Sequence, residues 1–275
     1  MTELFKTVLI LSSLGFALTA TLLCIKPVTA KKFPARWQYY IWITVMLCMV
    51  VPVYKFIPEA TVDNIIPQEN EPVKYVEVLP VDNVTKLPTQ TDEYIAEPQK
   101  DGLDFSKILS FAMRYLPYVW VLGMIIYLVF AFSSYFIFLW RKRKNSSECE
   151  NEVFEKIKQE LSINRRIPLR MASDISSPVL VGVFFPKVYV PCGELDEKQA
   201  RMVFMHELTH YKRHDLAVKW FSLFVNAIHW FNPLSYLLCR NISDACEVSC
   251  DIAVTKNMTQ EEQKLYMKTI LDFAR

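Results

Sequence analysis

Three long apolar runs dominate the pattern of hydrophobic and polar positions along the chain. Residues 7–25, 37–54 and 115–140 contain no formally charged side chain. Each run approaches or exceeds the roughly 20 residues with which a helix crosses the hydrocarbon core of a bilayer. The pattern therefore predicts a mainly α-helical membrane protein with three transmembrane helices, the first two forming a hairpin within residues 1–57.

Two clusters of basic residues border these runs. One cluster lies between the first two runs, and the other follows the third: Lys26, Lys31, Lys32 and Arg36, then Arg141, Lys142, Arg143 and Lys144. The positive-inside rule places both clusters in the cytoplasm and the N-terminus outside. Residues 105–144 are thus read as a third span with a basic clamp in a multi-pass protein of the cell membrane.

The segment between the second and third runs is acidic and rich in proline. Residues 55–104 carry eleven acids and four bases, whereas the whole chain of 275 residues has a net charge of only +2. We expect residues 58–104 to be an extended or disordered extracellular loop. The small net charge argues against a direct nucleic-acid partner, and only five glycines argue against a glycine-rich nucleotide-binding fold.

Residues 145–275 are predicted to form a cytoplasmic domain that mixes helices with a small sheet. Asp196 and Gln199 have the spacing of a capping box at the start of a helix that ends near His214. The other expected elements are a helix over 152–161, strands over 179–185 and 187–191, and helices over 243–256 and 261–275.

The most informative motif is His206-Glu207-x-x-His210 on the helix after Asp196. Histidines at positions i and i+4 stand one turn apart on one helix face, so both can bind one Zn²⁺ ion. Glu207 lies between them and can act as the general base toward the attacking water. The motif alone is moderately specific, because an exposed helix carries the same five residues by chance.

A catalytic zinc needs a third protein ligand and an open position. Glu247 is the candidate ligand on a downstream helix, and Asp251, one turn later, can hold the imidazole N–H of a ligand histidine. Between the two halves of this site, residues 220–239 are uncharged. A single crossing there would separate Glu247 from His206, so Asn232-Pro233 is read as the break of a membrane-associated helical hairpin over about 216–240.

Other ligand sets stay open at this point. Cys246 and Cys250 are also spaced i, i+4, and with the two histidines they could close a structural Cys₂His₂ site. His214 is a further potential ligand at the end of the helix. His229, among aromatic and aliphatic residues, is read as a core histidine.

Several ordered motifs resemble the M56 membrane metallopeptidases, the protease modules of the beta-lactam-sensing BlaR/MecR-type signal transducers. They are Ser177–Gly182, Pro186–Pro191, His206–Asp215, Trp230–Leu234 and Ala245–Asp251. The resemblance covers nearly the whole chain. It implies a gluzincin-like α+β zinc peptidase domain with His206, His210 and Glu247 as zinc ligands, Glu207 as catalytic base and Asp251 behind a ligand.

The sequence departs from the family pattern in two places. The family usually has Cys-Asp-Glu where this chain has Cys250-Asp251-Ile252. Sensor-transducers of the family continue into a further span and an extracellular penicillin-binding domain, whereas this sequence ends at Arg275. A truncated chain and a family member without that sensor are both left open.

The resulting hypothesis is a membrane-embedded zinc endopeptidase with a cytoplasmic active site. The resemblance implies regulated cleavage of a cytoplasmic repressor, of the chain itself, or of both, in an antibiotic response. Candidate substrate-binding residues are Val179 and Val181 on an edge strand, together with Arg240 and Asn241. The alternatives are a membrane quality-control protease and a non-catalytic signalling scaffold with a structural zinc; homo-oligomers are left open.

Overall fold

A computed structural model describes residues 1–52, 105–193 and 196–273 of the chain. Residues 1–52 and 117–275 form one compact unit, and residues 53–116 form a second. The predicted extracellular loop over 58–104 lies outside the described residues.

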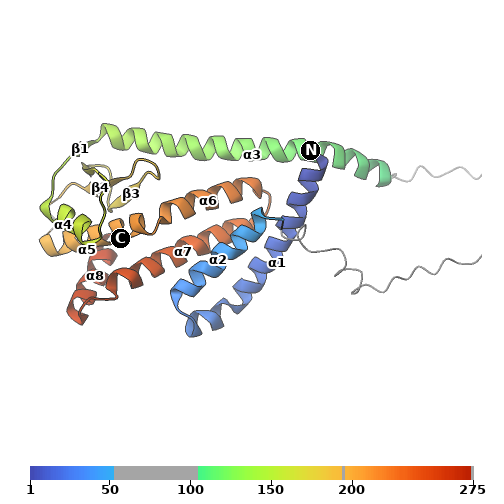
Figure 1. The fold of residues 1–275 in the computed structure, drawn as a ribbon. Coiled ribbons are helices and arrows are strands. Elements are labelled where there is room, and N and C mark those ends of the chain that lie inside the picture. Colours follow the sequence, from blue (N-terminus) through green and yellow to red (C-terminus); the bar gives the residue numbers. More distant parts are fainter. Residues whose placement is uncertain (53–104, 194–195, 274–275) are drawn as a thin grey trace, which may run out of the picture. The chain divides into compact units, whose positions relative to one another are not determined.

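The described chain is mostly helical, with a small sheet, as the apolar pattern predicts (Figure 1). Its elements in chain order are α1 Thr2–Lys32, α2 Ala35–Val50, α3 Phe105–Lys144, β1 Ser146–Glu148, α4 Glu152–Glu160, β2 Leu169–Ala172, β3 Val179–Val181, β4 Lys187–Pro191, α5 Glu197–Lys212, α6 Asp215–Ile228, α7 Pro233–Thr255 and α8 Gln260–Phe273.

Two of the described helices, α1 and α3, are long and apolar enough to cross a membrane. The prediction of three such helices is therefore wrong in number. Helix α2 has only 16 residues, which corresponds to about 24 Å of helix and falls short of a hydrocarbon core of roughly 30 Å. The uncharged run over 37–54 predicted more helix than forms, since α2 ends at Val50 and Pro52 is not helical.

Instead of lying among lipids alone, α2 packs into the protein. Its buried side chains include Tyr39, Trp42 and Met46, which share an apolar cluster with Leu238 and Ile242 of α7. Because this face is covered by α7, α2 connects the N-terminal helices with the helices that follow the sheet.

The uncharged run over 220–239 does contain the predicted break. Helix α6 ends at Ile228, and α7 begins at Pro233 with the Asn232 side chain accepting a hydrogen bond from the Leu234 N–H at 3.0 Å. Proline fits the first position of a helix because the missing N–H has no helical partner there. Residues 215–255 are therefore a helical hairpin.

The turn of this hairpin is anchored among the N-terminal helices. His229 Nε2 lies 3.1 Å from the Met49 carbonyl oxygen, and the Asn232 amide donates to Ser12 Oγ at 2.9 Å. The buried side chain of His229 agrees with its reading as a core histidine. At the other end of α6, Asp215 contacts Tyr39 near the start of α2, so α6 runs beside α2.

The sheet has the strand order β1-β2-β4-β3 and is mixed: β2 and β4 are parallel, and the two outer pairs are antiparallel. One face packs on α4 and α5 in the main core, through residues such as Leu180, Val188 and Phe204. The other face packs on the end of α3, where Val181 and Tyr189 meet Phe138. The sheet is therefore held directly beside the last turns of α3.

Some local predictions for this region need correction. Strands β1 and β2 were not anticipated, and the strand predicted over 179–185 ends at Val181, because Gly182 turns the chain with φ of 92°. The capping box does not form: Asp196 is at the N-cap of α5 but makes no side-chain cap hydrogen bond. Helix α5 ends at Lys212, and His214 has φ of 58° before α6 begins.

Close packing of α3 on the hairpin turn gives a test of this fold. A Cβ atom at Gly123 would lie 2.3 Å from Cε2 of the Trp230 ring, so Gly123→Val forces the ring to move. We expect the midpoint of thermal unfolding in detergent to fall by on the order of 5 °C, as for an overpacked core. Val129→Ile, at a position of α3 that is 59% exposed, is the control and should leave the midpoint unchanged. Equal midpoints for the two variants would contradict this packing.

Candidate metal centre

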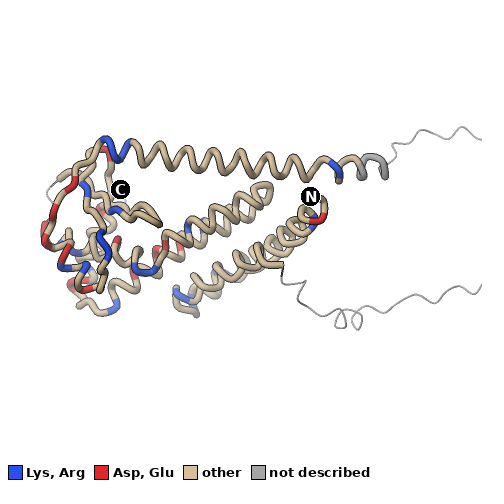
Figure 2. Tube along the Cα trace, turned by 45° about the horizontal axis from the view of Figure 1, so that its top comes forward, with Lys and Arg blue, Asp and Glu red and all other residues tan. Residues whose placement is uncertain are grey.

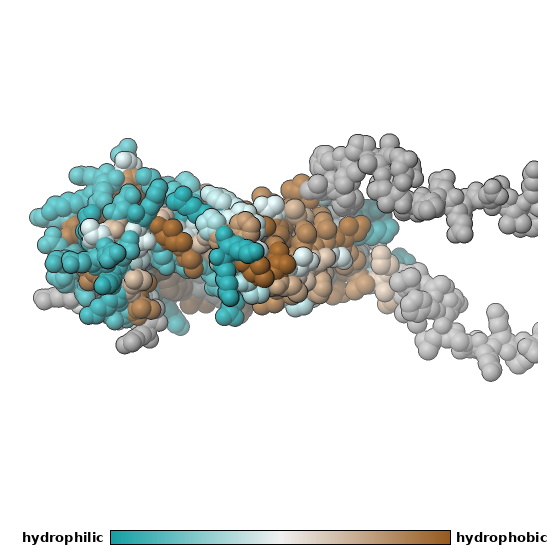
Figure 3. Space-filling view, turned by 90° about the horizontal axis from the view of Figure 1, so that it is seen from below, coloured by the Kyte–Doolittle hydropathy of each residue, from teal (hydrophilic) through white to brown (hydrophobic). Residues whose placement is uncertain are grey.

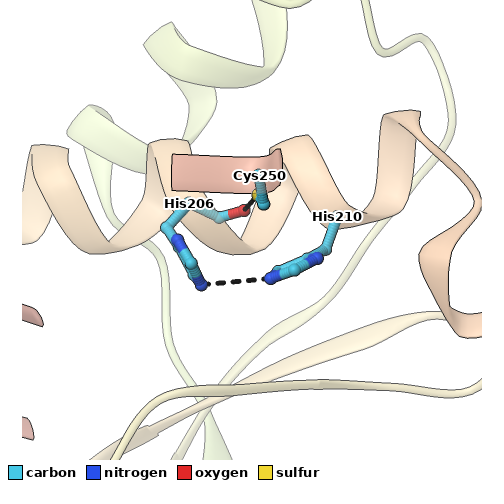
Figure 4. Close-up of side chains that lie close together, drawn as sticks. All are labelled: His206, His210 and Cys250. Carbon is cyan, nitrogen blue, oxygen red and sulfur yellow. Dashed lines mark hydrogen bonds between the residues drawn. The ribbon is translucent and has the colours of Figure 1, made fainter. Parts of the chain in front are cut away.

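Helix α5 presents the two histidines of the motif side by side. The Nε2 atoms of His206 and His210 lie 3.1 Å apart, and both side chains are buried. Figure 4 shows both rings projecting from the same side of α5 with these nitrogens facing each other. The i, i+4 spacing thus produces the predicted juxtaposition.

Glu247 of α7 completes a triangle with the two histidines. Its Oε2 atom lies 3.1 Å from His210 Nε2 and 3.6 Å from His206 Nε2. Bonds of 2.0–2.1 Å in a tetrahedral zinc site imply distances of about 3.3–3.4 Å between ligand atoms. The three measured separations bracket that value, so the donors fit one zinc ion with a fourth position left for water or substrate.

The second oxygen of Glu247 has a separate partner. Lys219 Nζ on α6 donates to Glu247 Oε1 at 2.8 Å. This ion pair directs the other oxygen, Oε2, toward the histidines. Lys219 therefore helps to hold Glu247 as a ligand through one oxygen.

The far nitrogens of both histidines are also bonded. His210 Nδ1 lies 2.8 Å from Asp215 Oδ2, and His206 Nδ1 lies 2.7 Å from the Tyr266 hydroxyl, which donates to Asp251 at 2.6 Å. A hydroxyl that donates to Asp251 accepts from His206, so Nδ1 carries the proton. Both Nε2 lone pairs are then free for a metal, the arrangement in which outer partners support metal-binding histidines.

The structure therefore places Asp251 behind a candidate ligand, at 3.4 Å from His206 Nδ1 and with Tyr266 between them. Asp215 and Tyr266 were missed by the sequence reasoning. Asp215 follows His210 by five residues, and the left-handed backbone at His214 brings its carboxylate back to the ring, a turn that the helix period does not indicate. Tyr266 had no local signal in the sequence, because it lies on α8, 60 residues after His206.

Glu207 points from α5 to the sheet. Its Oε2 accepts a hydrogen bond of 2.7 Å from the Leu180 N–H of β3. Burial raises the pKa of Glu207, and the neighbouring histidines only partly offset this effect. A raised carboxylate pKa suits a group that must accept and return a proton near neutral pH.

A cleft of about 320 Å³ lies between β3 and the helices. It is lined by the candidate ligands and by Glu207, together with residues of β3, α6 and α8: Val179, Leu180, Leu216, Lys219, Ile270 and Phe273. The metal donors are therefore open to a molecule that enters beside the edge strand of the sheet.

The two cysteines lie close to different sets of potential metal donors. One donor atom each from Cys250, His206 and His210 lie within 4.8 Å of one another, and so do one each from Cys246, His210 and Asp215. Figure 4 shows Cys250 against the backbone of α5, where its thiol donates to the His206 carbonyl at 3.8 Å. Among the described residues, no single group contains both cysteines and both histidines, so the closed Cys₂His₂ alternative lacks support. His214 does not line the cleft.

Only one of the four predicted substrate-binding residues lines the cleft. Val179 and Val181 both pack in the cluster against α3, and of the two only Val179 also lines the cleft. Arg240 and Asn241 are not brought to the cleft. Asn241 is buried and hydrogen-bonded to Lys26 and to the Leu237 carbonyl. The roles of these residues stay predictions.

Comparison with known proteins now identifies the family. A family model described as BlaR1 peptidase M56 matches residues 6–275. The chain belongs to the M56 peptidase family. It is 29% identical over 161 residues to the regulatory protein BlaR1 of Bacillus licheniformis, and 26% identical over 160 residues to the methicillin resistance mecR1 protein of Staphylococcus aureus strain Mu50. Each match covers 56% of this chain but only 27% of the relative's length.

Ligand variants separate the possible donor sets in this M56 family member. We expect the full chain to bind one zinc ion, and Glu247→Ala to lose most of that affinity because an oxygen donor disappears. Cys250→Ser is the matched variant one turn away and should still bind one equivalent. Metal content after dialysis measures both, and zinc lost from Cys250→Ser but kept by Glu247→Ala would contradict the assignment.

The protonation of the histidines predicts a pH dependence for metal binding. Burial lowers the pKa of His206, but hydrogen bonding to Asp251 and Glu247 outweighs burial and raises it to about 9. His206 without metal is therefore protonated at pH 7, and metal binding must displace the proton. We expect zinc affinity to rise from pH 7 to pH 9 with at least one proton released. Calorimetry in buffers of different ionisation enthalpy measures this release, and a pH-independent affinity would contradict it.

Proposed function

We propose that this chain is a membrane-embedded zinc endopeptidase whose active site faces the cytoplasm. The observation that carries the proposal is the triangle of His206, His210 and Glu247 donors beside the buried carboxylate of Glu207. The arrangement supplies metal ligands, a proton acceptor and an open cleft in one place. Membership of the M56 peptidase family supports a metallopeptidase.

Zinc bound by His206, His210 and Glu247 would polarise the scissile carbonyl and lower the pKa of the attacking water. Glu207 accepts the proton of that water and returns it to the leaving amine. Asp215 and Tyr266 hold the two imidazole rings by their Nδ1 atoms, which keeps Nε2 directed at the centre.

The substrate backbone is expected to enter along β3. This strand is at the edge of the described sheet and pairs only with β4 there. The Leu180 N–H is turned away from β4 toward Glu207, so the free edge of β3 faces the cleft. An extended peptide can add to such an edge through its backbone.

The apolar helices support a location in the membrane. Figure 2 shows long uncharged stretches in α1 and α3, with basic residues gathered where α3 ends, and Figure 3 shows hydrophobic surface over the helices and hydrophilic surface around the sheet. The candidate span in α3 is not buried inside the protein. By the positive-inside rule, Arg141–Lys144 and Lys31–Arg36 lie in the cytoplasm and the N-terminus lies outside.

The hairpin and the sheet fit this arrangement. Asn226 of the hairpin donates a hydrogen bond to the Tyr127 hydroxyl of α3 at 3.1 Å, an internal pairing of polar groups that suits apolar surroundings. The β3–β4 loop carries Phe184 and Phe185, 79% and 80% exposed, next to the end of α3. Such exposed apolar side chains suit the inner face of a bilayer, which supports a position of the cleft close to it.

The biological role is proposed from the relatives. One is named a regulatory protein and another a methicillin resistance protein. We infer regulated proteolysis in signal transduction, with a cytoplasmic repressor or the chain itself as substrate. Membrane quality control is the remaining enzymatic alternative.

Replacement of the proton acceptor tests the reaction. Glu207→Gln keeps the size of the side chain but removes the base, so we expect hydrolysis to fall by about 10²–10⁴-fold with zinc content unchanged. Cleavage of a quenched peptide library by the purified full chain, with metal analysis, measures both quantities. Glu197→Gln, in the exposed first turn of the same helix, is the control and should retain wild-type activity.

Two outcomes would argue against the proposal. Undiminished cleavage by Glu207→Gln would exclude Glu207 as the base. Zinc removal that unfolds the wild-type chain, without cleavage under any condition, would favour a structural metal in a signalling scaffold.

A further inference from the structure

A tyrosine of α2 contacts the carboxylate that holds a metal ligand. The Tyr39 hydroxyl donates to Asp215 Oδ1 at 3.2 Å, and Asp215 Oδ2 accepts from His210 Nδ1 at 2.8 Å. The three groups are 176 and 5 residues apart in sequence. They form a continuous relay from the N-terminal helices to the candidate metal.

The relay is buried at each step. Asp215 is 1% exposed and Tyr39 is 5% exposed. A buried carboxylate needs donors on both oxygens, because an unpaired one costs free energy. Arg213 Nε and His210 satisfy Oδ2, while Tyr39 is the donor that contacts Oδ1 within the described part of the chain.

Arg213 also contacts the ring of Tyr39. Its guanidinium lies 5.5 Å from the centre of the Tyr39 ring, and it donates to the Ser249 carbonyl of α7 at 2.8 Å. The hydroxyl of Tyr39 therefore has one defined position. Tyr40, the next residue, is 64% exposed and takes no part in the relay.

We propose that Tyr39 is a positioning residue of the metal centre: through Asp215 it orients His210, so that α2 sets the metal affinity of the site. At its other end α2 contacts the hairpin turn, where the Met49 carbonyl pairs with His229. Movement of α2 relative to α6 would lengthen the contact between Tyr39 and Asp215 and release the His210 ring. The inference rests on the proposed zinc site but concerns its control.

The test is zinc affinity of the full chain in detergent, measured by competition with a chelator. Tyr39→Phe removes one oxygen atom and keeps the ring under Arg213. We expect it to weaken zinc binding by about 10-fold, at the lower end of the effect of outer-shell partners. Tyr40→Phe is the matched control and should bind zinc like the wild type. Tyr39→Phe also leaves Asp215 Oδ1 without this donor, so the metal-free variant should unfold at a somewhat lower temperature. Zinc affinity is therefore compared at a temperature where all three metal-free proteins are fully folded, which separates positioning from general stability.

A double-variant cycle tests the route through Asp215. Asp215→Asn alone should weaken zinc binding, and adding Tyr39→Phe should cause little further loss, because both act on His210 through one carboxylate. Wild-type affinity in Tyr39→Phe, or a full further loss in the Asp215→Asn background, would overturn the inference. Zinc binding by the wild type would persist in either case, so this failure is distinct from failure of the zinc site itself.

Discussion

Glu247 has to reach the face of α5 on which His206 and His210 stand, and the path of the chain between them follows from that requirement. The chain leaves the site with α6, and the intervening residues 220–239 are uncharged. Helix α7 must therefore return along α6 for Glu247 to meet the histidines. The turn between Ile228 and Pro233 makes this return possible. Without it, the 3.1 Å separation of His210 and Glu247 could not arise.

The return of the chain along α7 also links the packing of the apolar helices to the candidate metal site. Helix α7 packs on α2 through Leu238 and Ile242 and carries Glu247 one to three turns later. Helix α2 in turn contacts Asp215 through Tyr39. The positions of Glu247 and Asp215 thus depend on the packing of α7 and α6 against the N-terminal helix α2. Loss of that packing should therefore loosen the ligands even though α5 itself is covered by the sheet.

Residue spacing predicted much of this arrangement, and its limits have physical causes. The His206-Glu207-x-x-His210 spacing is local, so the helix period alone brings the histidines together. The hairpin was inferred because Glu247 had to share their side of the membrane, and Asn232-Pro233 supplied the break. Asp215 and Tyr266 were missed because a left-handed turn at His214 and the docking of α8 bring them in, and neither leaves a periodic pattern. The length of α2 was overestimated because the uncharged residues after Val50 do not have to be helical.

The central claim is that two histidines and one carboxylate, and no cysteine, hold the metal. X-ray absorption at the zinc edge of the full chain tests it most directly. The account predicts nitrogen and oxygen neighbours at about 2.0–2.1 Å, with the scattering signature of two imidazole rings and no sulfur. A sulfur neighbour at about 2.3 Å would contradict it, because it would bring Cys250 or Cys246 into the ligand set.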